Sequence, residues 1–289
     1  MGPDFLCIGA MKAGTSWLHH ALGQQPGVWM PPVKELHYLA GNPKDRLRSR
    51  LLLVRPVHRR ALYLGVRSAL RPWSADDRWR AAWALRFLTF PRTERGYASM
   101  FPDRPGTVRG ELTPTYAVLP EPAIARLAGM NPGLRIVYLL RDPVERAWSD
   151  LKMQVRKGEI AFDLAACGPS EREELVRPRQ LAHGDYVGNL ERWGRHFPPE
   201  QIHVEFFDRL ADDPAGLLRD VCRFLGLDDH EIRVPPDVDR PCNAGDTSSM
   251  PEATARFLAG TLGPSIEELH RVFANEHTAR WRSSCAARC

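Results

Sequence analysis

The sequence predicts an α/β fold: a P-loop-like three-layer sandwich with a central, mainly parallel sheet, plus an α-helical insertion. Two observations predict it. Short apolar runs alternate with helical patterns along most of the chain, which favours parallel strands joined by helices. The apolar run from Phe5 to Gly9 leads through a glycine-framed turn into a helix, a strand–turn–helix unit that suits such a sheet.

The expected elements can be followed along the chain. In the first helix Leu18, Ala21 and Leu22 form one apolar face. Asp142 and Pro143 are suited to the cap and first turn of a later helix. The expected elements are strand 4–9, helix 15–24, a strand near 107–111, helix 121–129, strand 134–140, helix 143–156, helix 185–196, strand 201–207, helix 213–225 and a helical tail from about 251 to 275.

Length and composition indicate a globular protein with one domain over residues 1–289. The 289 residues are 43% hydrophobic and 26% charged, enough apolar chain for a full core. No run of about 18 apolar residues occurs, and the N-terminus does not have the pattern of a signal peptide, so we expect a cytoplasmic protein with no membrane span. Six cysteines without a secretory signal do not indicate a disulfide framework.

The cysteines do not indicate a metal site either. We expect Cys7 in a core strand and Cys222 on the apolar side of a helix, both as small buried hydrophobic residues. Cys285 and Cys289 are expected in a short terminal tail, without partners at zinc-like spacing. No metal is therefore predicted.

Residues 41–106 interrupt the alternation and are interpreted as the helical insertion. The stretch 46–92 holds twelve arginines and only two acids, with Trp73, Trp79 and Trp83 among them. It predicts two or three short amphipathic helices and supplies much of the net charge of +5. The arginines either form a solvated cover over an apolar inner face or bind an anionic partner.

The turn between Gly9 and Gly14 has the features of a phosphate-binding loop. Amide groups of a helix N-terminus and the helix dipole favour an anion at this position. The Walker pattern places a lysine directly after the second glycine, but here Thr15 follows it and Lys12 precedes it. This departure weakens a kinase or ATPase interpretation and keeps anion binding.

Five blocks carry a resemblance to a known family. They are Phe5–Leu18, Val28–Tyr38, Gly110–Tyr116, Arg135–Ser149, and a final block that runs from Tyr186–Leu190 and Trp193 through the strand Gln201–Phe207 to Asp213–Leu227. In this order they resemble the sulfotransferases that use 3′-phosphoadenosine-5′-phosphosulfate (PAPS), and the chain looks most like the branch that contains the heparan sulfate sulfotransferases and their bacterial relatives. The resemblance covers about residues 4–40 and 107–275.

The resemblance implies a transferase that moves a sulfuryl group from PAPS to a hydroxyl, or alternatively an amine. The acceptor class would be a small molecule, a lipid or a glycan, and the product would be the desulfated nucleotide, PAP. The donor has no β/γ-phosphate pair for a metal to bridge, so no metal is required.

Site residues follow from the same resemblance. Lys12 would stabilise the leaving phosphate, and the amides and hydroxyls of the loop would hold the 5′-phosphosulfate; that loop comprises Lys12, Ala13, Gly14, Thr15, Ser16 and Trp17. Arg141 and Ser149 match the 3′-phosphate site, where arginine offers a bidentate fork. The base that takes the acceptor proton is Glu35, with His37 as the local competitor.

Two departures from the family pattern stand out. Leu112 occupies a position where the heparan sulfate enzymes usually carry a lysine, and the preceding Glu111 either orients a catalytic group or is structural. The late cofactor loop would lie at about 246–251, where Thr247 and Ser248 offer hydroxyls and no cation is present. Arg240 or Asn243 could substitute in that loop.

Two other protein classes compete with this interpretation. A small-molecule kinase would need a Mg²⁺-holding aspartate and the Walker lysine. A non-enzymatic anion- or nucleic-acid-binding protein would suit the arginine-rich insertion, but no known reading motif is present, so nucleic acid is not expected as a partner.

The acceptor itself is not identified by the sequence. We expect a small-molecule or carrier-bound acceptor, with an anionic one favoured by the arginines, and an insertion that lies over the active-site mouth. The arginine- and alanine-rich composition fits a GC-rich bacterium and sulfation in specialised metabolism. The sequence leaves the oligomeric state open.

Overall fold

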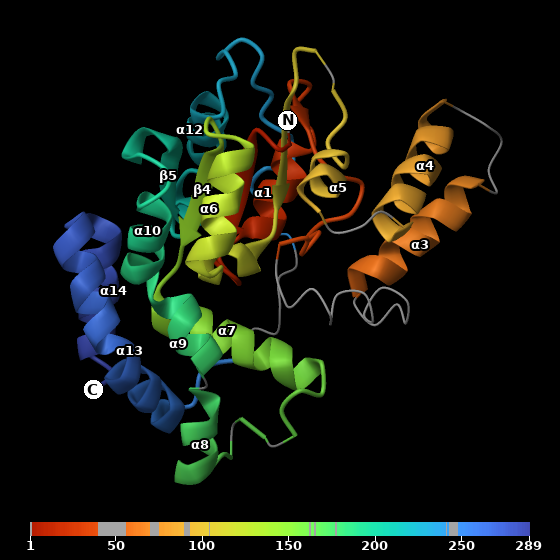
Figure 1. Cartoon of the computed structure of the whole chain (residues 1–289). Helices are drawn as coiled ribbons and strands as arrows, with labels where there is room; N and C mark the ends of the chain where they lie inside the picture. The colour runs from red at the N-terminus through yellow and green to blue at the C-terminus, as the bar shows by residue number, and fades with distance from the viewer. Residues whose placement is uncertain are drawn as a thin grey trace.

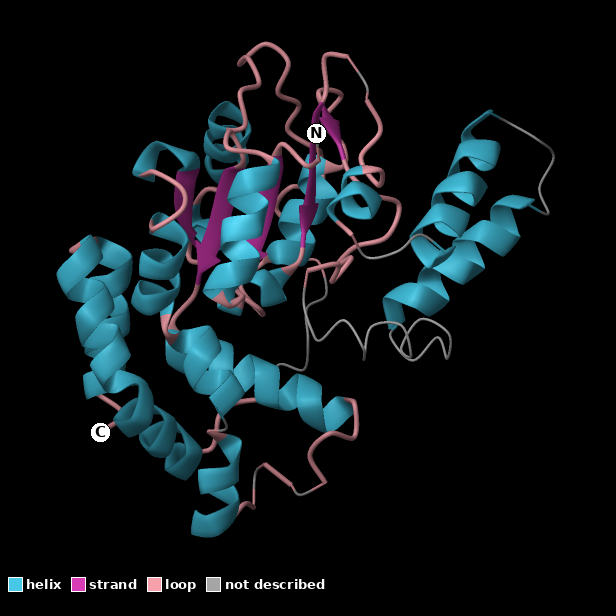
Figure 2. Cartoon of the chain, in the orientation of Figure 1, coloured by secondary structure: helices cyan, strands magenta, loops and turns pink. Residues whose placement is uncertain are grey.

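The computed structural model describes residues 2–39, 56–69, 75–89, 93–103, 105–161, 163–164, 166–176, 178–240, 242 and 248–289. At its centre is a five-stranded sheet of order β2-β3-β1-β4-β5, in which every neighbouring pair is parallel (Figures 1 and 2). The strands are β1 (Phe5–Gly9), β2 (Val28–Trp29), β3 (Val108–Leu112), β4 (Arg135–Leu140) and β5 (Ile202–Phe206). The predicted α/β class is confirmed.

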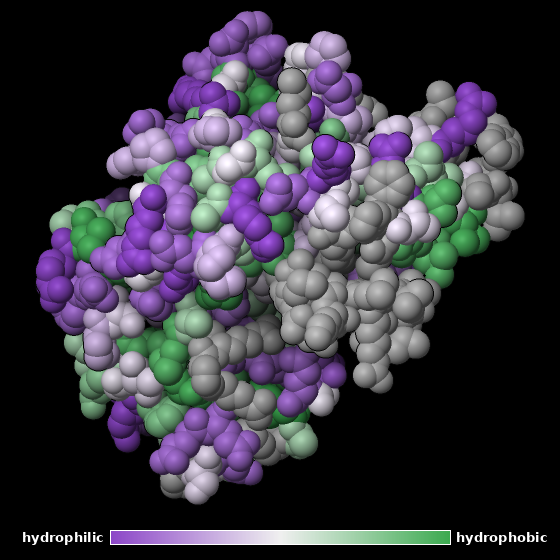
Figure 3. Space-filling model, viewed as in Figure 1, coloured by the Kyte–Doolittle hydropathy of each residue, from purple (hydrophilic) through white to green (hydrophobic). Residues whose placement is uncertain are grey.

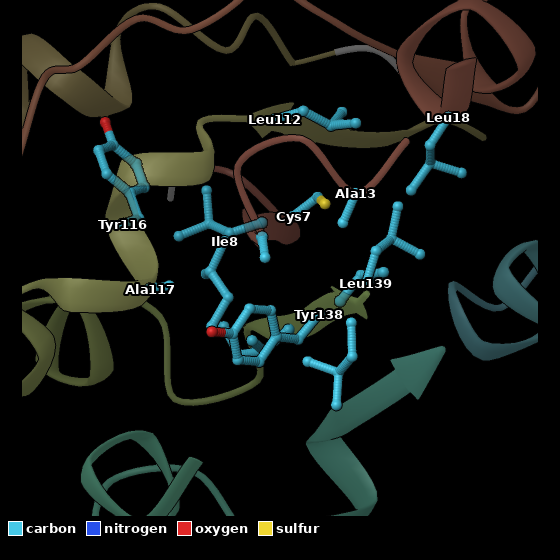
Figure 4. Close-up of a cluster of buried hydrophobic side chains, with 14 of the residues drawn as sticks. Cys7, Ile8, Ala13, Leu18, Leu112, Tyr116, Ala117, Tyr138 and Leu139 are labelled. Atoms are coloured by element: carbon cyan, nitrogen blue, oxygen red, sulfur yellow. The ribbon is translucent and has the colours of Figure 1, made fainter. Parts of the chain in front are cut away.

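The central strands are apolar because both faces of the sheet are covered. Every residue of β1 is buried, as are five of the six residues of β4. Gly110 on β3 is required by packing, since a Cβ there would lie 2.4 Å from the Phe5 ring. Figure 4 shows the resulting core, in which Cys7, Ile8 and Tyr138 lie below the turn that follows β1.

Helices cover both faces of the sheet. On one face α6, with α10 beside it, packs over the strands, while α1 and α12 pack together on the other face (Figure 1). Further helices lie at the carboxyl end of the strands or connect them. The helices outside the 41–106 region and the C-terminal end are α1 (Thr15–Leu22), η1 (Pro114–Val118), α6 (Glu121–Met130), α7 (Pro143–Arg156), α8 (Pro169–Leu175), α9 (Pro178–Gly184), α10 (Tyr186–Gly194), η2 (Pro199–Gln201), α11 (Arg209–Asp212) and α12 (Pro214–Phe224).

Helix α7 has the predicted bounds and the predicted cap. The Asp142 carboxylate accepts hydrogen bonds from the amides of Val144 at 2.8 Å and Glu145 at 3.4 Å, and Pro143 occupies the first position. Because β4 ends directly before this helix, Arg141 is fixed at the carboxyl edge of the sheet.

The helices expected in the arginine-rich region are present. They are α3 (Pro56–Ala69) and α4 (Ala75–Thr89), which pack against each other and are followed by α5 (Glu94–Ala98). Trp83 on α4 donates to the carbonyl of Met100 at 2.9 Å, and the rings of Trp79 and Trp29 lie 5.8 Å apart. These contacts attach the helical pair to the β2 end of the sheet, and Trp73 lies outside the described residues.

The surface of the helical pair is both apolar and basic. Leu62, Tyr63 and Val66 on α3 and Leu85 on α4 are exposed, and Figure 3 shows apolar side chains gathered on this part of the molecule. Exposed arginines of the same two helices surround them.

The C-terminal end departs from the prediction. The expected tail helix is α13 (Glu252–Phe273), but a second helix, α14 (Glu276–Ala286), follows it. Trp281 of α14 is buried and donates to the Asp208 carboxylate at 3.1 Å. Cys285 is therefore buried on a packed helix, and the prediction that it lies in a short terminal tail is wrong, whereas Cys7 and Cys222 are buried as predicted.

In the described parts of the chain no helix has both the length and the hydropathy needed to cross a bilayer.

Candidate active site

The turn after β1 is held in a conformation that only a glycine-containing loop can adopt here. Gly14 has φ +83°, and a Cβ at this position would lie 2.5 Å from Leu210 and 3.2 Å from Phe207. The amide of Ala13 is engaged within the turn, because it donates to the carbonyl of Ala10 at 3.2 Å. Leu18 donates to the Gly14 carbonyl at 3.0 Å, which leaves the amides of Gly14–Trp17 at the helix N-terminus for an anion.

Lys34 crosses from the neighbouring loop to this helix N-terminus. Its ammonium donates to the hydroxyls of Ser16 at 2.9 Å and Thr15 at 3.4 Å, and lies 3.3 Å from a carboxylate oxygen of Glu35. Lys34 therefore connects the anion-binding turn to the candidate base. Sequence reasoning did not select Lys34 as a site residue, although it directly precedes Glu35.

Glu35 and His37 lie side by side, so the structure brings both candidate bases to one place. Both have left-handed backbone conformations, with φ +61° and +49°. The Nε2 atom of His37 is 3.5 Å from the Glu35 carboxylate, and its Nδ1 atom is 3.1 Å from the Thr115 hydroxyl. Burial works against ionisation, but the hydrogen bond from His37 and the charge of Lys34 outweigh it and lower the pKa of Glu35 to about 2.

Glu111 lies beneath this segment at the end of β3. Its side chain is 2% exposed and accepts from the amide of Leu36 at 3.2 Å and the hydroxyl of Thr113 at 2.7 Å. Its other oxygen accepts from the hydroxyls of Tyr97 at 2.5 Å and Tyr116 at 3.1 Å. We name these groups the Glu111 cluster. Burial raises the pKa of Glu111, and the four donors act against that rise.

Arg141 holds the turn from the other side. Its guanidinium donates to the carbonyl of Lys12 at 2.8 Å and lies 4.5 Å from the centre of the Phe207 ring. The Tyr186 hydroxyl donates to the Arg141 carbonyl at 2.9 Å, which fixes the backbone. Lys12 and Arg141 are thus brought together from the ends of two adjacent strands.

Neither of these cations has a carboxylate within 4.0 Å in the part of the chain that the structure describes. Burial, followed by the positive charges of Arg156 and Arg141, lowers the pKa of Lys12. Burial also lowers the pKa of Arg141. The site is therefore short of negative charge, which favours binding of an anion.

The described end of the late loop, at Ser248, lies against α7. Ser149 is half-buried on α7. The carbonyl of Ser248 accepts from Trp148 Nε1 at 3.4 Å and from the ammonium of Lys152 at 3.2 Å. Lys152 is a cation at this loop that sequence reasoning missed, and the predicted Thr247 lies outside the described residues.

Comparison with known proteins decides the family. Residues 3–231 match the model of the sulfotransferase family. The chain belongs to that family. The resemblance found in the sequence is confirmed, and with it the transferase class.

The sulfotransferase has curated relatives in animals. It is 36% identical over 144 residues to heparan sulfate glucosamine 3-O-sulfotransferase 3B1 of Mus musculus, covering 47% of this chain and 33% of the relative. It is 27% identical over 204 residues to bifunctional heparan sulfate N-deacetylase/N-sulfotransferase 1 of Caenorhabditis briggsae, covering 64% of this chain and 24% of that protein. The chain thus spans about a third or less of the length of these relatives.

The sulfotransferase also resembles a solved structure over nearly its whole length. A sulfotransferase from Alicyclobacillus acidocaldarius superposes with a TM-score of 0.63 at 23% identity, covering 98% of this chain and 99% of the other. At that identity the likeness shows a shared fold.

Proposed function

We propose that this sulfotransferase uses PAPS as sulfuryl donor and a hydroxyl as acceptor, with PAP as the product. The observation that carries the proposal is the pair Lys12 and Arg141, two cations linked through the Lys12 carbonyl without a carboxylate within 4.0 Å among the described residues. A ligand with two separate phosphate groups matches this arrangement, because it neutralises both charges at the N-terminus of α1.

The residues divide between the two ends of the donor. Lys12, the amides of Gly14–Trp17 and the hydroxyls of Thr15 and Ser16 would hold the 5′-phosphosulfate. The guanidinium N–H groups of Arg141 that do not bind Lys12, together with Ser149, would hold the 3′-phosphate. Ser248 and Thr247 remain the predicted late-loop residues on this nucleotide.

PAPS supplies a sulfuryl group that undergoes in-line displacement. The acceptor oxygen forms a bond to sulfur while the bond from sulfur to the bridging oxygen breaks, and that electron pair leaves on the phosphate of PAP. Lys12 and the helix N-terminus stabilise this charge, since fixed donors act where negative charge develops. Glu35 accepts the hydroxyl proton.

In this proposal Lys34 couples donor binding to the pKa of Glu35. Its ammonium lies 3.3 Å from Glu35 and helps to lower the pKa of that carboxylate. A phosphosulfate at Ser16 offers the ammonium a second anion. Lys34 then shares its charge with the sulfuryl oxygens, the pKa of Glu35 rises, and the proton transfer becomes easier.

Calorimetry with PAP and with adenosine 5′-phosphosulfate tests the donor assignment. Tight binding is expected only for PAP, because the second ligand lacks the 3′-phosphate that Arg141 would bind. A thermal-shift panel of PAP, ATP with Mg²⁺, and duplex DNA separates this function from a kinase and from a nucleic-acid-binding protein. Only PAP should raise the melting midpoint. Equal affinity for PAP and adenosine 5′-phosphosulfate would remove the 3′-phosphate site.

We propose further that residues 41–106 form a helical insertion of a single domain over 1–289 and that it selects the acceptor. The exposed arginines and the apolar face of α3 and α4 suit an anionic small molecule or a carrier-bound acceptor. Sulfation in bacterial specialised metabolism, in the cytoplasm, remains the prediction drawn from the sequence.

Reversing charge on the insertion tests its role. Arg59→Glu with Arg60→Glu, both exposed on α3, is expected to raise the KM for the acceptor, most strongly at low salt, and to leave PAP affinity unchanged. Arg126→Glu with Arg282→Glu makes the same change in net charge at exposed positions on α6 and α14. If both pairs gave the same acceptor kinetics across a salt series, the insertion would be only a structural cover.

A further inference from the structure

We propose that Glu111 is a positioning residue for proton transfer: it fixes the backbone of Leu36 so that Glu35 and His37 meet at the acceptor oxygen. This inference rests on the proposed function. Among the described residues, the hydrogen bonds of the Glu111 side chain are all within the Glu111 cluster and include neither the turn after β1 nor the side chain of the base. Its effect must therefore pass through the segment that it holds.

The Glu111 cluster suits an ionised carboxylate. All four partners of Glu111 act as donors: one backbone amide and three hydroxyls. A carboxylate accepts at both oxygens, whereas a neutral acid or an amide places a hydrogen against one of these donors. The four hydrogen bonds stabilise the buried charge without any ion pair in the described part of the chain.

The segment that Glu111 holds is strained and needs support. Leu36 stands between two residues in left-handed conformations, Glu35 and His37. Such conformations are unfavourable in residues other than glycine and persist only where the surrounding structure holds them. The Leu36 side chain is fully buried and its amide is bound by Glu111, so this residue is fixed at both its side chain and its backbone.

A second contact fixes the far end of the same segment. Tyr116 donates to Glu111 and accepts from the amide of Leu39 at 3.3 Å. The amides of Leu36 and Leu39 are thus tied, directly and through one hydroxyl, to one carboxylate. His37 lies between these two points, and its ring is held by Thr115. By fixing the backbone at Leu36 and Leu39, the Glu111 cluster orients the side chains of Glu35 and His37.

Kinetics of Glu111→Gln test the proposal. The variant should lower kcat by about 10-fold or more, with PAP affinity and the KM for PAPS within about twofold of the wild type. Thr113→Val is the matched control, because it removes one donor to the same carboxylate and leaves the Leu36 amide paired. Its kcat should fall far less. A correctly folded Glu111→Gln with unchanged kcat would overturn the proposal.

A double-mutant cycle with Glu35→Gln distinguishes positioning from general stability. If Glu111 acts through Glu35, Glu111→Gln should have little further effect once Glu35 is already Gln. If kcat of the double variant fell by the product of the two single-variant decreases, the two residues would act independently and the proposal would be overturned. If the wild-type protein did not bind PAP, the proposed function itself would be contradicted. Failure of the Glu111 proposal and failure of the proposed function therefore give different results.

If Glu111→Gln does not fold, Tyr116→Phe supplies the measurement. It removes one donor to Glu111 and the acceptor for Leu39, and should lower kcat several-fold with PAP affinity preserved. Equal losses of kcat and PAP affinity would mean that the cluster only maintains the fold.

Discussion

Glu35→Gln is expected to lower turnover by about 100-fold or more while PAP affinity remains nearly intact. The amide keeps the size of the side chain and cannot take the acceptor proton. Donor binding is expected to survive because, among the described residues, the ion pairs of Glu35 are with Lys34 and His37 and not with the turn after β1. Steady-state kinetics and PAP calorimetry on the same preparation measure the two quantities.

His37→Ala is the companion variant for that experiment. It removes the group that hydrogen-bonds Glu35 and leaves the carboxylate, so a smaller loss of turnover is expected. An active Glu35→Gln beside an inactive His37→Ala would transfer the role of base to His37.

Lys12→Ala is expected to lower both turnover and PAP affinity. Turnover should fall by about 100- to 1,000-fold, as for the loss of one donor to a developing oxyanion. In the proposed function the ammonium stabilises the charge on the leaving phosphate, and it has no carboxylate within 4.0 Å among the described residues. Single-turnover kinetics separate the chemical step from binding. Lys157→Ala removes an exposed cation whose charge acts on Lys12, and should leave turnover close to that of the wild type.

The pH dependence of PAP binding offers an independent check on Lys12. Burial and neighbouring positive charges lower the pKa of Lys12, and a bound anion would favour its protonated form. PAP affinity should therefore fall as the pH rises through this lowered pKa, earlier than for an ordinary lysine. Lys12→Ala should lose that part of the pH dependence, and an identical profile in the variant would assign it to another group.

Much of the fold was predictable because local rules and tertiary packing agree. Helix α7 carries its own start signal in Asp142 and Pro143, β1 is apolar throughout, and β4 is apolar after its first residue, Arg135. Helix α14 was missed because its sequence has weak amphipathicity, with arginines and small residues between its buried positions, and it is stabilised by packing against α13.

The arrangement of the candidate site was predictable where its residues are close in sequence, as in the turn after β1 and at Glu35 and His37. It was less predictable where contacts join distant segments. Nothing local shows that Lys34 reaches Ser16, or that Lys152 reaches the carbonyl of Ser248. The family resemblance left Glu111 with two interpretations because a carboxylate on a strand does not reveal which donors surround it.

The hydrogen bond from Tyr97 to Glu111 limits how acceptor selectivity can be transplanted between relatives. Tyr97 belongs to α5, at the end of the arginine-rich region, yet its hydroxyl completes the Glu111 cluster. A chimera that replaced the whole region up to β3 would remove this donor along with α3 and α4, the helices proposed to select the acceptor. The junction of such a chimera is best placed between α4 and α5. A new pair of helices then replaces α3 and α4, and Tyr97 is kept with the rest of the chain.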